Sequence, residues 1–333
     1  MEKASCQTIY LYAYNPIEKF NFKLKKFSSS KLTYEILFDS PFKTNIKNND
    51  LIYFNFYPSL NITELKPLVI LLHGFGSKPN KLNNYFDFIE FLRSNNFSSI
   101  FMHLPYHLSR TPENESSGER LIYFDDKQTL EFFHQAVVDI RKVIHFSKSV
   151  LKFNDIILIG FSLGSMISAI VSAVEKNISK TVLILGGGNW HEVHWCSLLS
   201  HVLKGNCLKQ ENDKIDKNKC KKIYQNFYDF KEEFKKIDLN KTPIDFTLLN
   251  NPELKSKTTK LCFLCDPLAF TNLINKDKIL MINSRFDHYF NKKSTIELWK
   301  NIGKPKIYWF NKFHTSSILK NSKVQKIILD FIN

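Results

Sequence analysis

The stretch Ile156-Ile157-Leu158-Ile159-Gly160-Phe161-Ser162-Leu163-Gly164-Ser165-Met166-Ile167-Ser168-Ala169-Ile170-Val171 decides the fold predicted for this chain. Its first four residues are typical of a buried strand, and the residues after Gly164 favour a helix. A serine in such a strand–turn–helix has a strained backbone, so small residues are needed two positions before and after it. We therefore expect the Ser162 hydroxyl at the carboxyl end of the strand, beside a helix N-terminus that favours negative charge. A glycine-flanked serine in a tight turn without function is the alternative.

Outward from this stretch, apolar runs without alternation indicate strands covered on both faces. They occupy residues 67–72, 99–102, 181–185, 278–282 and 306–310, and helical patterns lie between them at 82–94, 127–148, 163–176, 291–301 and 316–332. Strands alternating with helices favour parallel crossovers. Residues 33–41 and 51–57 predict an antiparallel hairpin. The predicted fold is α/β, a doubly wound and mostly parallel sheet of about eight strands.

A long gap between the strands at 181–185 and 278–282 breaks this alternation. Within it lie apolar residues that step by four and three, which predicts an amphipathic helix of about four turns: Ile223, Phe227, Phe230, Phe234 and Ile237. We expect a core of residues 1–188 and 276–333, with residues 189–275 inserted as a helical lid or cap.

Composition excludes several classes of protein. The chain has 333 residues, of which 43% are hydrophobic and 24% charged, which excludes disordered, collagenous and fibrous proteins. No apolar run is long enough to span a membrane. Residues 1–7 lack the features of a secretory signal, which predicts a cytoplasmic protein. Six cysteines are too few for a disulfide scaffold, and Cys262 and Cys265 lack the context of a zinc or redox motif, so buried thiols are expected.

The formal net charge of +15 raises nucleic acid, membrane surfaces and anionic substrates as partners. Only five residues are arginine, and lysine is spread along the whole chain. Specific nucleic-acid sites cluster arginine and aromatic residues on one face. The prediction is a solvated basic surface without a specific nucleic-acid partner.

Two further residues provide the groups that a nucleophilic serine needs, a base and an acid that orients the base. Asp287 follows the strand at 278–282, and His314 follows the strand at 306–310. Because open α/β sheets bind ligands at the carboxyl ends of their strands, we expect Ser162, His314 and Asp287 to meet there. Asp266 and Asp277 are alternative acids, and His288 is an alternative base.

An oxyanion requires at least two backbone N–H donors. The amide of Leu163 is one candidate. The second is the amide of Phe75, in His73-Gly74-Phe75-Gly76, whose glycines allow a sharp turn at the end of the strand at 67–72. A glycine-rich turn without function is again the alternative.

On these motifs the chain resembles the α/β-hydrolase superfamily over about residues 33–332. The resemblance implies that Ser162 is the nucleophile, His314 the base and Asp287 the orienting acid, and that no cofactor and no metal takes part. Ser165 stands where a second glycine is frequent, and Phe313 precedes the histidine where glycine is common.

The segment His103–Pro112 resembles the corresponding loop of bacterial serine hydrolases of unassigned substrate. Its Arg110 is either a grip for a substrate carboxylate or an anchor for the acidic loop that follows. His191 and His194 are spaced to share a metal on a helix, but a pocket-lining role is the stronger hypothesis, since no third ligand is identifiable.

The predicted function is that of a serine hydrolase, which cleaves a carboxylic ester of a small molecule through an acyl-enzyme. Alternatives are a thioesterase or peptidase of the same fold, and a non-catalytic scaffold that binds a ligand or partner. The sequence carries no prediction of an oligomeric state.

Overall fold

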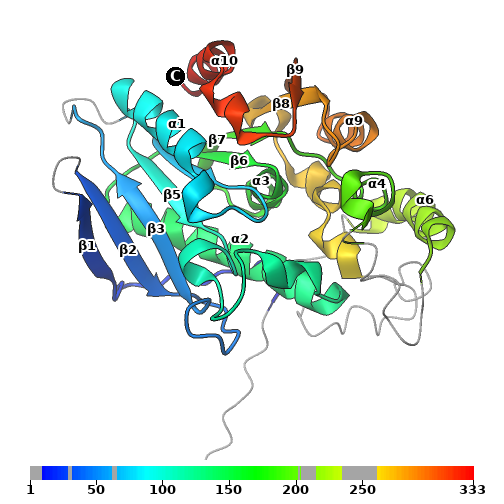
Figure 1. Cartoon of the computed structure of the whole chain (residues 1–333), viewed down its shortest axis with the longest axis horizontal. Coiled ribbons are helices and arrows are strands. Elements are labelled where there is room, and N and C mark those ends of the chain that lie inside the picture. Colours follow the sequence, from blue (N-terminus) through cyan, green and yellow to red (C-terminus); the bar gives the residue numbers. More distant parts are fainter. Residues whose placement is uncertain (1–9, 29–31, 62–65, 202, 204–214, 235–260) are drawn as a thin grey trace, which may run out of the picture.

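The computed structural model describes residues 10–28, 32–61, 66–201, 203, 215–234 and 261–333 (Figure 1). Nine strands form one sheet in the order β1-β2-β3-β5-β4-β6-β7-β8-β9. Their bounds are β1 Lys23–Ser28, β2 Thr33–Asp39, β3 Leu51–Tyr57, β4 Leu68–Leu72, β5 Ser99–His103, β6 Ile156–Phe161, β7 Ile178–Ile184, β8 Ile279–Phe286 and β9 Lys306–Phe313.

The strands from β5 to β9 in this order are parallel to one another, and β1, β2 and β3 join them antiparallel. The doubly wound, mostly parallel sheet predicted from the sequence is confirmed, and so is the antiparallel pair β2–β3. No strand is predicted at β1, because its lysine-rich residues lack an apolar pattern. In the structure, β1 is held by its antiparallel pairing with β2.

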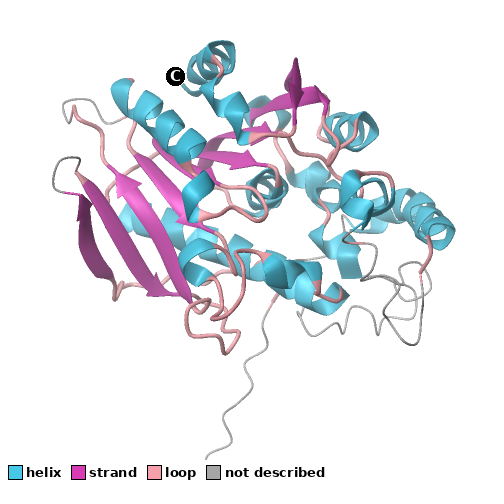
Figure 2. Cartoon of the chain, viewed as in Figure 1, coloured by secondary structure: helices cyan, strands magenta, loops and turns pink. Residues whose placement is uncertain are grey.

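Helices cover both faces of the sheet (Figures 1 and 2). The helices are α1 Asn83–Ser94, α2 Asp126–Ser149, α3 Leu163–Val174, α4 Trp190–Trp195, α6 Lys217–Phe234, α9 Lys292–Asn301 and α10 Ser322–Ile332. One apolar core lies between the sheet and α1 and α10, and the other lies on the side of α2, α3 and α9. Neighbouring β6 residues divide between them: Ile157 is buried with α1 and α10, whereas Leu158 is buried with α2 and α3. This division explains why the central strands are apolar at every position.

One strand differs from its expected environment. The apolar run at 306–310 predicts a strand covered on both faces, but β9 pairs only with β8 and lies at the edge of the sheet. Tyr308 is 40% exposed and Phe313 is 63% exposed. The prediction is wrong because aromatic residues favour strands at edges as well as at the centre.

The predicted insert is partly described. It contributes α4, α6 and the 3-10 helices η6 Leu261–Cys265 and η7 Pro267–Leu273. η6 packs against α2, and η7 packs against α3 and α9, so that Phe270 is fully buried in the larger core. The predicted amphipathic helix corresponds to α6, but the side chains of Phe227, Phe230 and Phe234 and the whole of Ile237 lie outside the described residues. The division into core and lid stays a prediction.

None of the helices described has both the length and the apolar content that crossing a bilayer demands.

Candidate active site

Ser162 lies in the sharp turn between β6 and α3. Its backbone has φ 55° and ψ −116°, a region that residues with a side chain rarely adopt. The amide of Ser162 donates to the carbonyl of Ile184 on β7 at 2.9 Å, which ties the turn to the neighbouring strand. Strain at a serine held in this way is a feature of functional turns.

The glycines on either side of Ser162 have no room for a side chain. A Cβ atom on Gly160 would lie 2.2 Å from the carbonyl oxygen of Gly164. A Cβ atom on Gly164 would lie 2.7 Å from the carbonyl oxygens of Leu72 and His73 at the end of β4. The Gly-x-Ser-x-Gly spacing is therefore a packing requirement of this turn.

His314 links the serine to the aspartate. Its Nε2 atom lies 2.8 Å from Ser162 Oγ, and its Nδ1 atom lies 2.7 Å from Asp287 Oδ2. The other oxygen of Asp287 accepts the amides of Tyr289 and Phe290 at 2.9 Å and 2.8 Å. Since a carboxylate can only accept, the proton of His314 lies on Nδ1, and Nε2 is left as an acceptor for the serine hydroxyl.

The backbone amides of Leu163 and Phe75 belong to residues that line the same cavity as Ser162. The amide of Leu163 is at the first position of α3, where amides have no acceptor within the helix. The amides of Gly74 and Gly76, which flank Phe75, donate to Tyr85 Oη and His107 Nε2. The Phe75 amide between them has no hydrogen-bond acceptor in the described part of the chain.

A cavity of about 540 Å³ opens above these groups. Ser162, His314, Phe75 and Leu163 line it. The rest of its wall is mostly apolar and comes from α2, α3 and the segment that starts with α4, including Phe132, Phe133, Met166, Trp190, Val193 and Leu199. The arrangement can therefore hold an apolar group next to a serine that is hydrogen-bonded to a histidine.

Comparisons with known proteins agree with this architecture. Residues 61–211 match the model of the phospholipase/carboxylesterase family, and the matched region includes His73–Gly76 and the turn at Ser162. The chain has the fold of the α/β-hydrolase superfamily, and the family match lies within that fold.

The chain is also similar to solved structures. Acetyl xylan esterase 1 from Thermoanaerobacterium sp. JW/SL YS485 aligns with a TM-score of 0.57 and 16% identity over 97% of this chain and 89% of the esterase. The acylaminoacyl peptidase of Pyrococcus horikoshii aligns with a TM-score of 0.53 and 14% identity over 94% of this chain and 41% of the peptidase. At such identities the likeness extends to the fold alone.

A curated relative matches a shorter part of the chain. The uncharacterized protein YdjC of Bacillus subtilis (strain 168) is 32% identical over 69 residues. That match covers 21% of this chain and 60% of the relative's length.

The alternative acids and base lie elsewhere in the structure. Asp266 is fully buried and accepts the amides of Asn189 and Trp190 at the start of α4. Asp277 is exposed. The Nδ1 atom of His288 lies 3.2 Å from the carbonyl of its near neighbour Phe286. Of these candidate acids and bases, His314 contacts Ser162, and Asp287 contacts His314.

Arg110 takes neither of the two roles expected for it. Its side chain is fully buried and pairs with Asp139 of α2 at 2.8 Å. The acidic loop is held instead by Arg120, which pairs with Glu115. Sequence reasoning missed the partner of Arg110 because Asp139 lies within a helix and carries no motif.

Both departures from the superfamily pattern fit the local packing. Ser165 is buried against Gly186, where a Cβ atom would lie 2.1 Å from Ser165 Oγ. A small residue at 186 thus makes room for the serine. Phe313 is 63% exposed, so its side chain requires no space inside the site.

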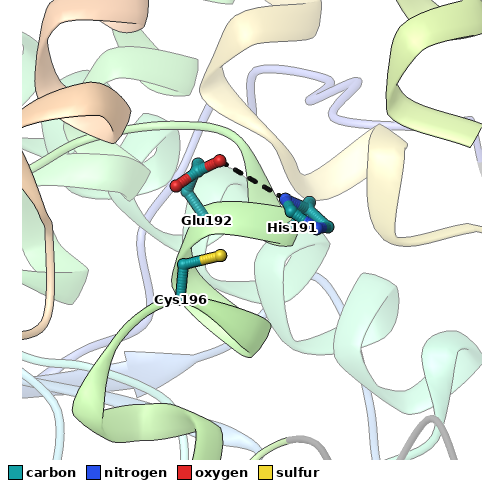
Figure 3. Close-up of side chains that lie close together, drawn as sticks. All are labelled: His191, Glu192 and Cys196. Atoms are coloured by element: carbon teal, nitrogen blue, oxygen red, sulfur yellow. Dashed lines mark ion pairs between the residues drawn. The ribbon is translucent and has the colours of Figure 1, made fainter. Parts of the chain in front are cut away.

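One group of possible metal ligands occurs among the described residues, on α4 and at the residue after it (Figure 3). Ligand atoms of His191, Glu192 and Cys196 lie within 4.8 Å of one another. The Glu192 carboxylate is already bound by Lys293 Nζ at 2.6 Å and by the Asn291 side-chain amide at 3.0 Å. The hydrogen bond to His191, together with these two, lowers the pKa of Glu192 to about 2. A cation there would have to displace the lysine. His194, the partner that the sequence suggested for His191, lines the cavity instead.

His107 is a residue beside the site to which no sequence pattern points. It follows β5, and β5 is the neighbour of β4, whose end carries the His73–Gly76 segment. This strand order, rather than a local motif, places His107 beside that segment.

Proposed function

We propose that this protein is a serine hydrolase that cleaves carboxylic esters, with Ser162, His314 and Asp287 as its catalytic triad. The observation that carries the proposal is the placement of His314 between Ser162 Oγ and Asp287 Oδ2, at 2.8 Å and 2.7 Å, in the wall of an apolar cavity. The match of residues 61–211 to the phospholipase/carboxylesterase family supports the same reaction.

In the proposed reaction, Ser162 Oγ attacks the ester carbonyl carbon while His314 Nε2 takes the hydroxyl proton. The carbonyl electron pair moves to oxygen, where the amides of Phe75 and Leu163 donate to the oxyanion. The intermediate then expels the alcohol, which takes the proton from His314, and an acyl-serine remains. Water attacks this acyl-enzyme with His314 as base, which releases the acid and restores the serine.

The apolar wall supports a substrate whose acyl group is hydrophobic. Trp190, Val193 and Leu199 come from the beginning of the predicted insert, and Phe132 and Phe133 come from α2 on the core. We infer that residues 189–275 act as a cap that completes the acyl-binding cavity over the core formed by residues 1–188 and 276–333.

Replacing the nucleophile tests this proposal. We expect Ser162→Ala to lower kcat for p-nitrophenyl acyl esters by about 10⁴-fold or more, since it removes the group that forms the acyl-enzyme. Ser168→Ala is the matched control, because it deletes the same hydroxyl from a buried position further along α3. A Ser162→Ala enzyme with full activity would refute the assignment.

Covalent labelling and a substrate panel separate the alternatives. A fluorophosphonate should label Ser162 in the folded protein, whereas a non-catalytic scaffold would remain unlabelled. Oxygen esters, acyl thioesters and peptide amides of matched acyl group then distinguish an esterase from a thioesterase or a peptidase. We expect oxygen esters to give the highest kcat/KM, with longer acyl chains preferred to acetyl.

A further inference from the structure

The segment after β5 lies against the His73–Gly76 segment, which follows β4. Two contacts join them: the Leu104 amide donates to His73 Nε2 at 3.2 Å, and the Gly76 amide donates to His107 Nε2 at 3.2 Å. Just after the segment, Ser117 Oγ donates to the carbonyl of Ser77. The segment that carries the Phe75 amide is thus held from outside by residues 104–117.

These contacts fix the direction of the Phe75 N–H. The Gly74 carbonyl belongs to the same peptide plane as this N–H, and it accepts Ser77 Oγ at 2.9 Å and His73 Nδ1 at 2.8 Å. The following peptide is held through the Gly76 N–H on His107. Because a peptide plane is rigid, fixing the groups on both sides of Phe75 orients its amide.

The His107 ring has a single protonation state that suits this contact. Its Nδ1 atom lies 2.8 Å from the Pro105 carbonyl, which can only accept, so Nδ1 carries the proton and Nε2 is an acceptor. Burial, together with the charge of Arg110, lowers the pKa of His107 to about 4. The neighbouring His73 is also kept neutral by burial, which holds its pKa well below the usual range.

We propose that His107 is a positioning residue of the active site, whose Nε2 atom holds the Gly76 amide and thereby aims the Phe75 N–H at the oxyanion. This inference rests on the proposed hydrolase function. His107 does not line the cavity and so acts through the His73–Gly76 segment rather than on the substrate.

Two substitutions separate the acceptor from the rest of the ring. In His107→Gln, the side-chain oxygen takes about the place of Nε2 and can accept the Gly76 amide. In His107→Asn, the shorter amide can donate to Pro105 but does not reach Gly76. We expect His107→Asn to lower kcat by about 10- to 100-fold with KM within about twofold, and His107→Gln to recover most of that loss; removing an oxyanion donor outright costs about 10²- to 10³-fold.

Inhibitor binding gives a readout that a purely structural role would not move. An alkyl trifluoromethyl ketone forms an oxyanion on Ser162, whereas the corresponding secondary alcohol fills the cavity without one. We expect Ki of the ketone to rise in His107→Asn in proportion to the loss of kcat/KM, with Ki of the alcohol unchanged.

The control is His134→Gln, which removes the buried Nδ1 acceptor of the Tyr12 amide at a residue that does not line the cavity. It should lower the melting temperature and leave kcat and both inhibition constants intact. Gly118→Ala disrupts the hydrogen bond between Gly76 and His107 in a second way, because its Cβ atom would lie 2.4 Å from His107 Nε2. We expect the same loss of kcat and of ketone binding.

Wild-type kcat in folded His107→Asn or Gly118→Ala, or equal losses in His107→Asn and His107→Gln, would overturn the inference. Full activity of Ser162→Ala would instead overturn the proposed function. The two failures are therefore distinguishable.

Discussion

Asp287 selects one tautomer of His314, because its Oδ2 atom can only accept the proton of Nδ1. Its Oδ1 atom is held by the amides of Tyr289 and Phe290. An amide in its place would present either a donor to the Nδ1 proton or a weaker acceptor. We expect Asp287→Asn to lower kcat by about 10³- to 10⁴-fold, with little change in KM, as measured with the best ester of the panel. Asp277→Asn is the control, since Asp277 is exposed. Equal activity of the two variants would contradict the role given to Asp287.

For single residues, the sequence predicts a functional position where the chemistry depends on local geometry. The serine turn needs Gly160 and Gly164 within a few residues of Ser162, so its motif is readable. His107 and Asp139 have no such local signature. Their partners, Gly76 and Arg110, are brought to them by neighbouring strands and by α2.

Among the elements, α4 depends on one buried carboxylate. Asp266 accepts the amides of Asn189, Trp190 and Leu268 at 3.1, 3.0 and 2.9 Å and also the hydroxyl of Tyr224 from α6. Burial raises the pKa of Asp266, and these donors oppose the rise. The carboxylate therefore joins α4, α6 and η7 at the edge of the cavity.

Removing the Tyr224 hydroxyl tests how much its hydrogen bonds contribute to stability. We expect Tyr224→Phe to lower the free energy of unfolding by about 1–3 kcal/mol, because Asp266 loses a buried donor and the Trp190 amide loses one of its acceptors. KM for long-chain esters should rise, since Trp190 lines the cavity. Tyr308→Phe, at a residue that is 40% exposed on β9, should change neither quantity. Urea titration and ester kinetics measure the two effects.

A buried ion pair joins the segment after β5 to α2. Arg110 Nη2 lies 2.8 Å from Asp139 Oδ2, and Ser40 Oγ donates to Asp139 Oδ1 at 2.6 Å. Arg110 also donates to the carbonyl of Asn49 at 2.6 Å. The pair thus connects three segments that are distant in sequence.

Breaking one side of this pair leaves the other charge buried. We expect Arg110→Met to lower the free energy of unfolding by about 3–5 kcal/mol. The double variant Arg110→Met/Asp139→Leu should lose less than the sum of the two single variants, because no unpaired charge remains. Additive losses in chemical denaturation would argue against coupling.

For the whole molecule, four buried histidines make stability depend on pH. Burial lowers the pKa of His103 to about 3, of His107 to about 4 and of His134 to about 3, and it holds that of His73 well below its usual value. In the unfolded chain these groups titrate near pH 6.5, so between pH 6.5 and about 4 the unfolded state binds more protons. The free energy of unfolding should therefore fall as the pH drops through this window.

Each histidine adds at most about 1.4 kcal/mol per pH unit to the slope of the free energy of unfolding against pH. The buried carboxyls of Asp139 and Asp266, whose pKa values are raised, act in the opposite direction but are fewer. Urea denaturation at pH 7 and pH 5 measures the effect. His134→Phe should flatten the slope by the share of one histidine, and an unchanged slope would contradict a neutral His134 in the folded protein.

The sequence by itself determined the alternation of strands and helices and the serine turn, because both depend on contacts between residues close in the chain. It also gave the order of the serine, acid and histidine candidates. Only the tertiary structure decided that His314 and Asp287, rather than His288 and Asp266, lie at the serine, that β9 is an edge strand, and that Arg110 is buried. These outcomes depend on which strand ends lie side by side, and that order follows from packing of the whole sheet rather than from any local pattern.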